Sequence, residues 1–229
     1  MPLPPLEVQE QIVAEIEGYQ KIVTAARQIV ETYKPHIAID PSWPMVELGE
    51  VCNLTYGYTD TALDEGDARF IRITDIGEDG LLRENDIKYI RLNDEAKKYL
   101  LSRGDVLVAR TGATYGKTLY FDLDFPAVFA SYLIKLSFDK DKVIPKYYWV
   151  FTLSDSYDEQ KRRLMTGGGQ PQFSANLIKK IRIPLPDTAT QNLIVLEAEK
   201  EAELINANKQ LIEIFEQKIK DELAKVWNG

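Results

Sequence analysis

A repeat at the two ends of the chain is the sequence feature that most constrains the fold. Pro2-Leu3-Pro4 recurs as Pro184-Leu185-Pro186, and the Gln, Ile-Val and Glu positions that follow it recur at the same offset. Eight of 16 aligned positions are identical, and the two copies lie 182 residues apart. Solenoid proteins repeat about every 20 to 50 residues, so this period indicates a connector, one complete module and a second connector. We therefore predict a connector over 1–39, a module over 40–183 and a connector over 184–229.

The first connector has the apolar periodicity of a long helix. Apolar residues recur every three or four positions from Val8 to Tyr33, a seven-residue repeat that is typical of a helix packed on another helix. Pro4-Pro5 comes directly before this pattern and Pro35 comes directly after it. Proline is tolerated at a helix start and disfavours continuation, so these residues predict the two helix ends.

The second connector is predicted to be helical in the same way. Thr188 and Gln191 have the spacing of an N-terminal capping box, and an apolar stripe is expected from Leu204 to Val226. Such stripes must be buried against each other or against a partner, so the helices either mediate assembly or only cover the module. The residues predicted to contact a partner helix are Val8, Ile12, Ile16, Tyr19, Val23, Val30, Leu204, Asn208, Leu211 and Phe215.

The segment between the connectors mixes two kinds of local pattern. Short runs rich in β-branched and aromatic residues predict strands, and two longer runs, 95–101 and 146–164, predict helices. The fold class is therefore α+β, a mixed α/β module flanked by two long coiled-coil-forming helices. The predicted strands are 70–74, 86–90, 105–109, 118–121, 132–136 and 180–183.

Several residue counts and motifs argue against an enzyme. The chain has one Cys and one His, too few for a cysteine metal cluster, a two-His metal site or a Ser-His-Asp triad. Between Gly112 and Gly116 lie three residues, whereas a phosphate-binding P-loop has four. Asp40-Pro41-Ser42-Trp43 lacks the second proline of the similar amino-methyltransferase motif. We predict no catalytic residue, no metal and no cofactor on this chain.

The apolar runs and the N-terminus predict the compartment. Uninterrupted apolar runs are about five residues long, far below the ~20 that a membrane helix needs. The first residues have neither the basic start nor the apolar core of a secretory signal. The sequence therefore predicts a cytoplasmic protein without a membrane segment.

Charge is distributed unevenly along the chain. The formal net charge is −8, but residues 103–182 contain 13 Lys and Arg against 8 Asp and Glu, a net charge of +5. A basic segment within an acidic chain indicates a local surface for a polyanion. The overall charge favours the competing interpretation, a surface that binds only protein.

Polar loops in and near the basic segment supply groups that can contact DNA. Arg and Lys suit phosphates and guanine, Gln and Ser can bond base edges, and glycine permits close backbone approach. A loop between two predicted strands, a Gly/Gln loop after a basic helix end and an aromatic-glycine turn fit this description. The predicted DNA-binding residues are Arg110, Thr111, Thr114, Tyr115, Lys117, Lys161, Arg162, Arg163, Gly168, Gly169, Gln170, Gln172 and Ser174, with Tyr56, Tyr58 and Thr59 as weaker candidates.

Taken in order, these motifs resemble the specificity (S) subunit of type I restriction-modification systems. The module opens with Val46-Glu-Leu-Gly-Glu-Val-Cys52 and continues with Gly104-Asp-Val-Leu-Val-Ala-Arg-Thr-Gly-Ala-Thr-Tyr-Gly-Lys117. Gly169-Gln170 is then followed by Phe173-Ser-Ala-Asn-Leu-Ile178 and Ile181-Arg-Ile-Pro-Leu-Pro186. The repeated connector completes a resemblance that covers essentially the whole chain.

The resemblance implies a non-catalytic DNA-recognition subunit. Members usually hold two target-recognition domains, whereas this chain has one module between two connectors and looks like a half-sized form. It would read one half of a bipartite double-stranded DNA site and dock modification (M) subunits, which methylate adenine with S-adenosylmethionine, while a restriction (R) subunit cuts. One module cannot read two half-sites, so we expect a homodimer that recognises a palindromic bipartite sequence. The alternative is a helical adaptor that binds only protein partners.

Overall fold

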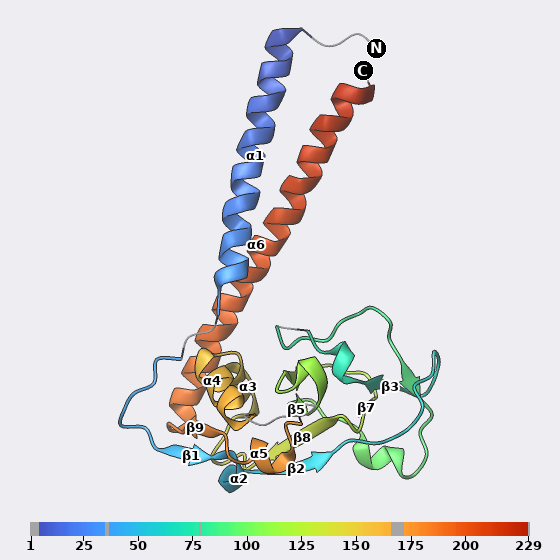
Figure 1. Ribbon diagram of the computed structural model, residues 1–229, viewed down its shortest axis with the longest axis vertical. Helices are drawn as coiled ribbons and strands as arrows, with labels where there is room; N and C mark the ends of the chain where they lie inside the picture. Colours follow the sequence, from blue (N-terminus) through green and yellow to red (C-terminus); the bar gives the residue numbers. More distant parts are fainter. Residues whose placement is uncertain (1–4, 35–36, 78, 166–171, 229) are drawn as a thin grey trace. The chain divides into compact units, whose positions relative to one another are not determined.

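A computed structural model describes residues 5–34, 37–77, 79–165 and 172–228, with side chains to residue 225. The chain divides into two compact units (Figure 1). The helical unit comprises Met1–Lys34 and Glu197–Gly229, and the module comprises Pro35–Leu196. Long terminal helices and a module of mixed helix and sheet confirm the α+β fold class.

The helical unit is an antiparallel pair formed by α1 (Leu6–Thr32) and the C-terminal part of α6 (Thr188–Asn228) (Figure 1). The rings of Tyr19 and Phe215 are 5.3 Å apart, and the Tyr33 hydroxyl donates a 2.7 Å hydrogen bond to Glu201. The seven-residue stripe predicted for α1 is the face that becomes buried or half-buried from Ile12 to Tyr33, whereas its first predicted residue, Val8, is 39% exposed. The seams therefore pack against each other within one chain.

The stripe predicted for α6 is only partly correct. Phe215 and Asn208 lie on the half-buried face, but Leu204 and Leu211 are 66% and 36% exposed. The helix carries apolar residues on two faces, and the expected stripe combined members of both. The face toward α1 is formed by half-buried residues at heptad spacing, namely Glu201, Ile205, Asn208, Ile212, Phe215, Ile219 and Glu222.

The capping box predicted at the start of α6 is also not formed. The Asp187 carboxylate accepts from the Thr190 backbone N–H at 2.7 Å and serves as the cap. The Gln191 side chain instead points into the module, where it is fully buried. Its Oε1 accepts from the Ile144 N–H at 2.8 Å, and its Nε2 donates to the carbonyls of Lys142 and Pro186 at 2.8 and 2.9 Å. The glutamine thus joins three backbone segments of the module.

The described residues of the module form three sheets, and Figure 1 shows several of their strands. The largest is antiparallel, with strand order β2-β8-β5-β6, and a second sheet, β4-β3-β7, has a parallel pair between β3 and β7. A short antiparallel ribbon pairs β1 with β9 and brings Met45 opposite Pro184. The strands are β1 (Met45–Glu47), β2 (Cys52–Tyr56), β3 (Ala68–Ile71), β4 (Tyr89–Ile90), β5 (Asp105–Ala109), β6 (Thr118–Phe121), β7 (Ala127–Phe129), β8 (Leu133–Phe138) and β9 (Arg182–Pro184).

Helices of the module are short. The run predicted as one helix over 146–164 forms two. The first ends at Thr152 with Leu153 as its C-cap, and the Ser154 hydroxyl caps the second by accepting from the Tyr157 N–H. The run predicted over 95–101 forms only a 3₁₀ turn. The α-helices are α2 (Leu48–Val51), α3 (Pro145–Thr152), α4 (Asp155–Leu164) and α5 (Ala175–Ile178), and the 3₁₀ turns are η1 (Ile73–Asp75), η2 (Ala96–Tyr99) and η3 (Gly112–Thr114).

The core follows from the strand sequences. Residues Val106 to Ala109 of β5 are fully buried, so both faces of this strand are covered, and its two edges are paired by β8 and β6. An alternating strand would leave one face exposed, whereas a continuous apolar run fits this central position. Leu107, Phe121, Phe129 and neighbouring side chains form one cluster of buried residues in the module.

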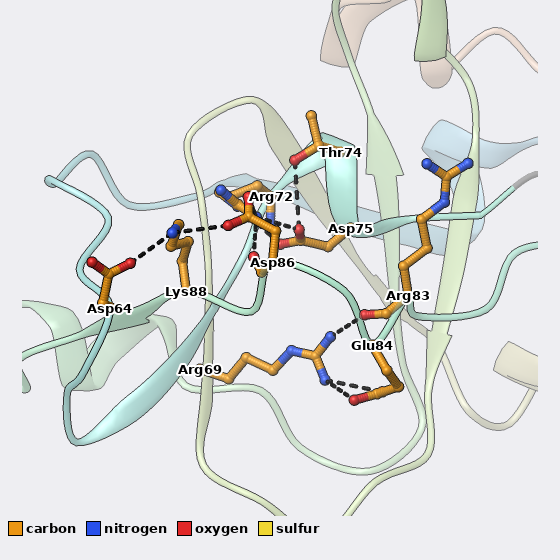
Figure 2. Close-up of polar contacts among 9 residues, drawn as sticks. All are labelled: Asp64, Arg69, Arg72, Thr74, Asp75, Arg83, Glu84, Asp86 and Lys88. Carbon is orange, nitrogen blue, oxygen red and sulfur yellow. Dashed lines mark hydrogen bonds and ion pairs between the residues drawn. The ribbon is translucent and has the colours of Figure 1, made fainter.

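An ion-pair network connects β3 to the segment that leads to β4 (Figure 2). Arg69, 5% exposed, donates to the Glu84 carboxylate at 3.2 Å, and Arg72 donates to the buried Asp75 at 2.7 Å. The hydrogen bond to Asp75 raises the pKa of the Arg72 guanidinium above its usual value. These arginines are neutralised within the module, so they are poor candidates for a polyanion surface. The other members of the network are Asp64, Thr74, Arg83, Asp86 and Lys88.

We expect the single cysteine to be unreactive in the folded chain. Cys52 is 8% exposed, and burial raises the pKa of its thiol to about 12. The thiolate is the reactive form, so an aromatic disulfide reagent at pH 8 should label Cys52 slowly in buffer and promptly in guanidinium chloride. Rapid stoichiometric labelling of the native chain would contradict this burial.

Candidate nucleic-acid interface

One end of the four-stranded sheet gathers residues from four distant parts of the chain. Neighbouring strands of this sheet are antiparallel, so the end of β2 lies beside the start of β8, and the end of β5 lies beside the starts of β8 and β6. Tyr56 is the last residue of β2, Arg110 directly follows β5, and Tyr132 directly precedes β8. A fourth segment joins them through a bridge between Thr111 and Gln172.

Arg110 lies at the centre of this sheet end. Its backbone N–H donates to the Tyr132 carbonyl at 3.0 Å, and its carbonyl accepts from the Phe173 N–H at 2.7 Å. The guanidinium carbon lies over two exposed rings, 5.1 Å from the centroid of Tyr56 and 5.7 Å from that of Tyr132. Tyr56 and Tyr132 are 42% and 54% exposed, so this cation lies over two rings that reach the surface.

The loop from Arg110 to Lys117 has a defined shape. It joins β5 to β6, as predicted, and turns through a 3₁₀ segment, with Gly112 and Gly116 at φ angles of 70° and 75°. Such positive angles favour glycine. The buried Tyr157 hydroxyl donates to the Gly116 carbonyl at 2.9 Å, which fixes the loop from beneath. Tyr115 packs on Phe173 with ring centroids 6.4 Å apart, so this predicted base reader supports the loop.

The other predicted loop residues are placed as follows. Thr111, Thr114 and Lys117 are half-buried, and the Thr114 hydroxyl donates to the Thr111 carbonyl at 3.3 Å. Gln172 is exposed and Ser174 half-buried beside Arg110 and Thr111. The structure therefore brings the loop over 110–117 and the segment from Gln172 together. Gly168, Gly169 and Gln170 lie outside the described residues.

The basic end of α4 divides into two kinds of side chain. Lys161 is only 17% exposed, pairs with Asp158 at 2.7 Å and lies over the rings of Tyr115 and Tyr157. Arg162 and Arg163 are exposed. Arg163 pairs with Glu159 at 3.3 Å, whereas Arg162 donates only to the Asp158 carbonyl among the described residues. Lys161 thus supports the loop, and Arg162 is the freer cation.

The aromatic-glycine turn is split by the fold. Tyr56 joins Arg110, and its hydroxyl accepts from the Ala175 N–H at 3.3 Å. Tyr58 instead packs on Tyr99 at 5.2 Å, in a different cluster of the module, and Thr59 is exposed. Gly57 separates them where a Cβ would lie 2.2 Å from the Ala130 carbonyl oxygen. Only Tyr56 of the three contacts the residues gathered around Arg110.

Two contributors to this surface were missed by sequence reasoning. Tyr132 was assigned to a strand, although it precedes β8 and is exposed. Ser131 accepts a 3.0 Å hydrogen bond from Arg110 Nε through its carbonyl. A large aromatic at the start of a strand that pairs with the Arg-bearing strand was the signal that could have found Tyr132.

Comparison with protein families decides the family. Residues 41–219 match the family model of the type I restriction modification DNA specificity domain. The chain belongs to this family. Its members are the non-catalytic specificity subunits of restriction-modification (R-M) systems, and this chain is accordingly a non-catalytic member. A search of curated proteins found no match.

Solved structures from type I R-M systems share the fold of this chain. This chain is similar to a chain from a type I R-M system studied for its complex assembly and conformational transition, at 22% identity and a TM-score of 0.63. It also resembles the S subunit from M. genitalium, at 14% identity and a TM-score of 0.59, and the HsdS subunit from Thermoanaerobacter tengcongensis, at 22% and 0.53. These matches cover 99%, 96% and 100% of this chain but 60%, 59% and 60% of those chains. This chain therefore spans about three fifths of the relatives' length.

Metal-ligand clusters and membrane-spanning helices are both absent from the described residues. Within them, no group of three or more His, Cys, Asp or Glu side chains is arranged to hold a metal ion. No helix in the same part of the chain combines the length and apolar character that crossing a membrane requires.

Proposed function

We propose that the chain is the DNA sequence-recognition subunit of a type I restriction-modification enzyme and that its module reads one half of a bipartite site. The observation that carries this proposal is the sheet end at which Tyr56, Arg110, Tyr132 and Gln172 converge. Its exposed rings, guanidinium and amide are groups that contact bases and phosphates. Backbone hydrogen bonds fix the segments that bear them, and the surrounding sequence is basic within an acidic chain.

The helical unit is proposed to dock the M subunits. After α1 and α6 cover each other's seams, their outer faces still expose large apolar side chains, which are typical of protein contact surfaces. Adenine methylation with S-adenosylmethionine would then take place on the M subunit and cleavage on an R subunit, in the cytoplasm. The exposed apolar residues of α1 are proposed for this docking, whereas those of α6 are considered below for a homodimer contact. They are Leu6, Val8, Val13, Ile22 and Ile29 on α1 and Leu204, Leu211, Ile214 and Leu223 on α6.

A host without other DNA methylation tests the proposed function. The chain would be co-expressed with a type I M subunit that is active with another S chain, and methylated adenines would be mapped across the genome by sequencing. A palindromic bipartite motif is expected if two copies of the module read the DNA. Methylation without a bipartite motif would contradict half-site reading. A stable complex without methylation would favour the adaptor that binds only protein.

We predict that the chain forms a homodimer through the exposed stripe of α6. Light scattering at micromolar concentration should give twice the 26.1 kDa chain mass. Leu204→Glu combined with Ile214→Glu should give the mass of one chain, because both side chains are more than half exposed in the single chain. Gln210→Glu, an exposed position on the same helix, is the control and should remain dimeric. A wild-type mass of one chain would contradict the homodimer.

Arg162→Ala should weaken DNA binding without changing sequence preference. The exposed Arg162 has no carboxylate partner among the described residues, so it suits a phosphate contact. Loss of one such contact weakens binding to all sequences and lowers the salt-dependence slope by about 1. Fluorescence anisotropy of labelled duplexes across a salt series measures both quantities.

Lys97→Ala is the matched control for this prediction. Lys97 is an exposed lysine of the module paired with Asp94, and its removal should leave affinity and salt slope unchanged. Lys161 is a weaker candidate for such a contact than Arg162, because its side chain is only 17% exposed and pairs with Asp158. An unchanged salt slope in Arg162→Ala would remove it from the DNA surface.

A further inference from the structure

We propose that Arg110, which lies over the rings of Tyr56 and Tyr132, reads a guanine of the target through its major-groove edge, and that Tyr132 is a specificity-determining positioning residue. This inference rests on the proposed function and deepens it. It assigns one base type to one side chain and adds Tyr132, which the sequence did not indicate, to the recognition surface.

Arg110 is fixed at its backbone and at the middle of its side chain. Its N–H and carbonyl bond to Tyr132 and Phe173 at 3.0 and 2.7 Å, from two different segments. Further out, Nε donates to the Ser131 carbonyl at 3.0 Å. The bond through Nε restricts the orientation of the guanidinium plane, since the five donors of this group have a fixed geometry.

The outer end of the guanidinium remains available. Among the described residues, no acceptor lies within hydrogen-bonding distance of its two terminal nitrogens, and neither is buried. Tyr56 and Tyr132 lie against the group at 5.1 and 5.7 Å, so cation–π attraction holds it while the terminal donors face solvent. An arginine that served only the fold would have these donors satisfied, as buried Arg69 does with Glu84 and the Arg83 carbonyl.

Paired terminal donors with restricted orientation match guanine. Guanine presents O6 and N7 as adjacent acceptors in the major groove, and bidentate contact by arginine is the commonest specific contact in protein–DNA complexes. A phosphate could also accept two such bonds. However, a phosphate contact gains little from the restricted orientation, whereas discrimination between base edges depends on it. Fixing the side chain before binding also lowers the entropy lost on binding.

Tyr132 acts through Arg110. Its ring is 54% exposed, yet its carbonyl and its ring both contact the arginine. The structure gives the hydroxyl no role in this contact, so the ring alone is required. Tyr132→Phe should therefore behave as wild type, whereas Tyr132→Ala should free the guanidinium and weaken its preference for guanine.

The test is a selection with the purified full-length chain from a library of random DNA duplexes, followed by sequencing. Wild type should enrich a motif with an invariant guanine. Arg110→Lys keeps the positive charge but lacks the fork, so it should lose preference at that one position. The affinity ratio between the guanine duplex and its adenine counterpart should fall by about 5- to 150-fold, the equivalent of the ~1–3 kcal/mol given by one bidentate pair.

Three measurements separate base reading from a structural role. A duplex with 7-deazaguanine at the enriched position removes the N7 acceptor, and it should weaken wild type more than Arg110→Lys, which lacks the planar fork. Tyr132→Ala should lose preference at the same position, and Tyr132→Phe should retain it. Arg91→Lys, an exposed arginine of the module paired with Asp67, is the matched control and should leave the motif unchanged.

Two results would overturn the inference while leaving the proposed function intact. One is an Arg110→Lys motif identical to that of wild type at every position. The other is an equal loss of affinity for all sequences, which would assign Arg110 to a phosphate. A wild-type chain that enriches no motif would overturn the proposed function and the inference with it. Circular dichroism confirms that each variant is folded.

Discussion

Replacing Gln191 by leucine is expected to lower the free energy of unfolding by about 2 to 4 kcal/mol. The fully buried amide makes three hydrogen bonds to backbone groups, and leucine can make none of them. The Ile144 N–H and the carbonyls of Lys142 and Pro186 would be left unsatisfied, and unpaired buried groups cost more than a hydrogen bond contributes. A loss of ~3 kcal/mol corresponds to roughly 6 to 12 °C in Tm for a chain of this size.

Thermal unfolding followed by near-ultraviolet circular dichroism measures this effect. Asn192→Leu is the matched control, because it places the same residue one position later on an exposed face of α6, and its Tm should change little. Gln191→Glu keeps the acceptor for Ile144 but brings a carboxylate to two carbonyl oxygens, so it should destabilise at least as much as leucine. Equal Tm values for Gln191→Leu and Asn192→Leu would show that the hydrogen bonds contribute nothing.

Ala26→Asp is expected to open the helical unit. Ala26 is 1% exposed, between α1 and α6, and an aspartate there would bury a carboxylate with a larger side chain. Burial of an unpaired charge costs on the order of 3 kcal/mol or more even after local relaxation. Two isolated helices gain most of their stability from their contact, so the helical signal should be lost at a lower urea concentration.

Ala25→Asp is the control for Ala26→Asp, because it introduces the same loss of helix propensity at an exposed position. The two alanines are adjacent on α1, but Ala25 is exposed, so the same substitution there should shift the urea midpoint only slightly. Far-ultraviolet circular dichroism across a urea series compares the two variants. If both shift the midpoint equally, the contact between α1 and α6 is not what stabilises these helices.

The local sequence pattern was sufficient to predict helices and strands whose residues are buried continuously or at a strict period. The apolar run of β5 and the heptad stripe of α1 were predicted correctly because a central strand and a packed helix each impose a simple period. Pattern was ambiguous for α6, because exposed Leu204 and half-buried Ile205 lie on different faces of the helix and both faces carry apolar residues. Which face contacts α1 depends on tertiary packing, which periodicity does not encode.

The sequence identified the loops that carry the candidate site, but it did not indicate which of them lie next to each other in the fold. Arg110 and Gln172 were selected from residue type alone, yet their proximity arises from strand pairing and from one bridge between segments more than 60 residues apart in sequence. Tyr132 was missed because a strand-forming aromatic and an exposed recognition aromatic look the same in sequence. Gln191 was misassigned for a related reason, since a capping position and an inward-pointing amide share the same spacing.

The β1–β9 ribbon has a consequence for how recognition can be exchanged between proteins. Met45 pairs with Pro184, and the Leu185 N–H donates to the Pro44 carbonyl at 2.8 Å, so the polypeptide enters the sheets of the module and leaves them through one pair of neighbouring strands. The start of α6 still belongs to the module, because Gln191 bonds to Lys142 and Ile144. A cassette from residue 44 to Leu196 keeps both this two-stranded stem and these contacts, and it is therefore a geometrically simple route to chimeric specificities.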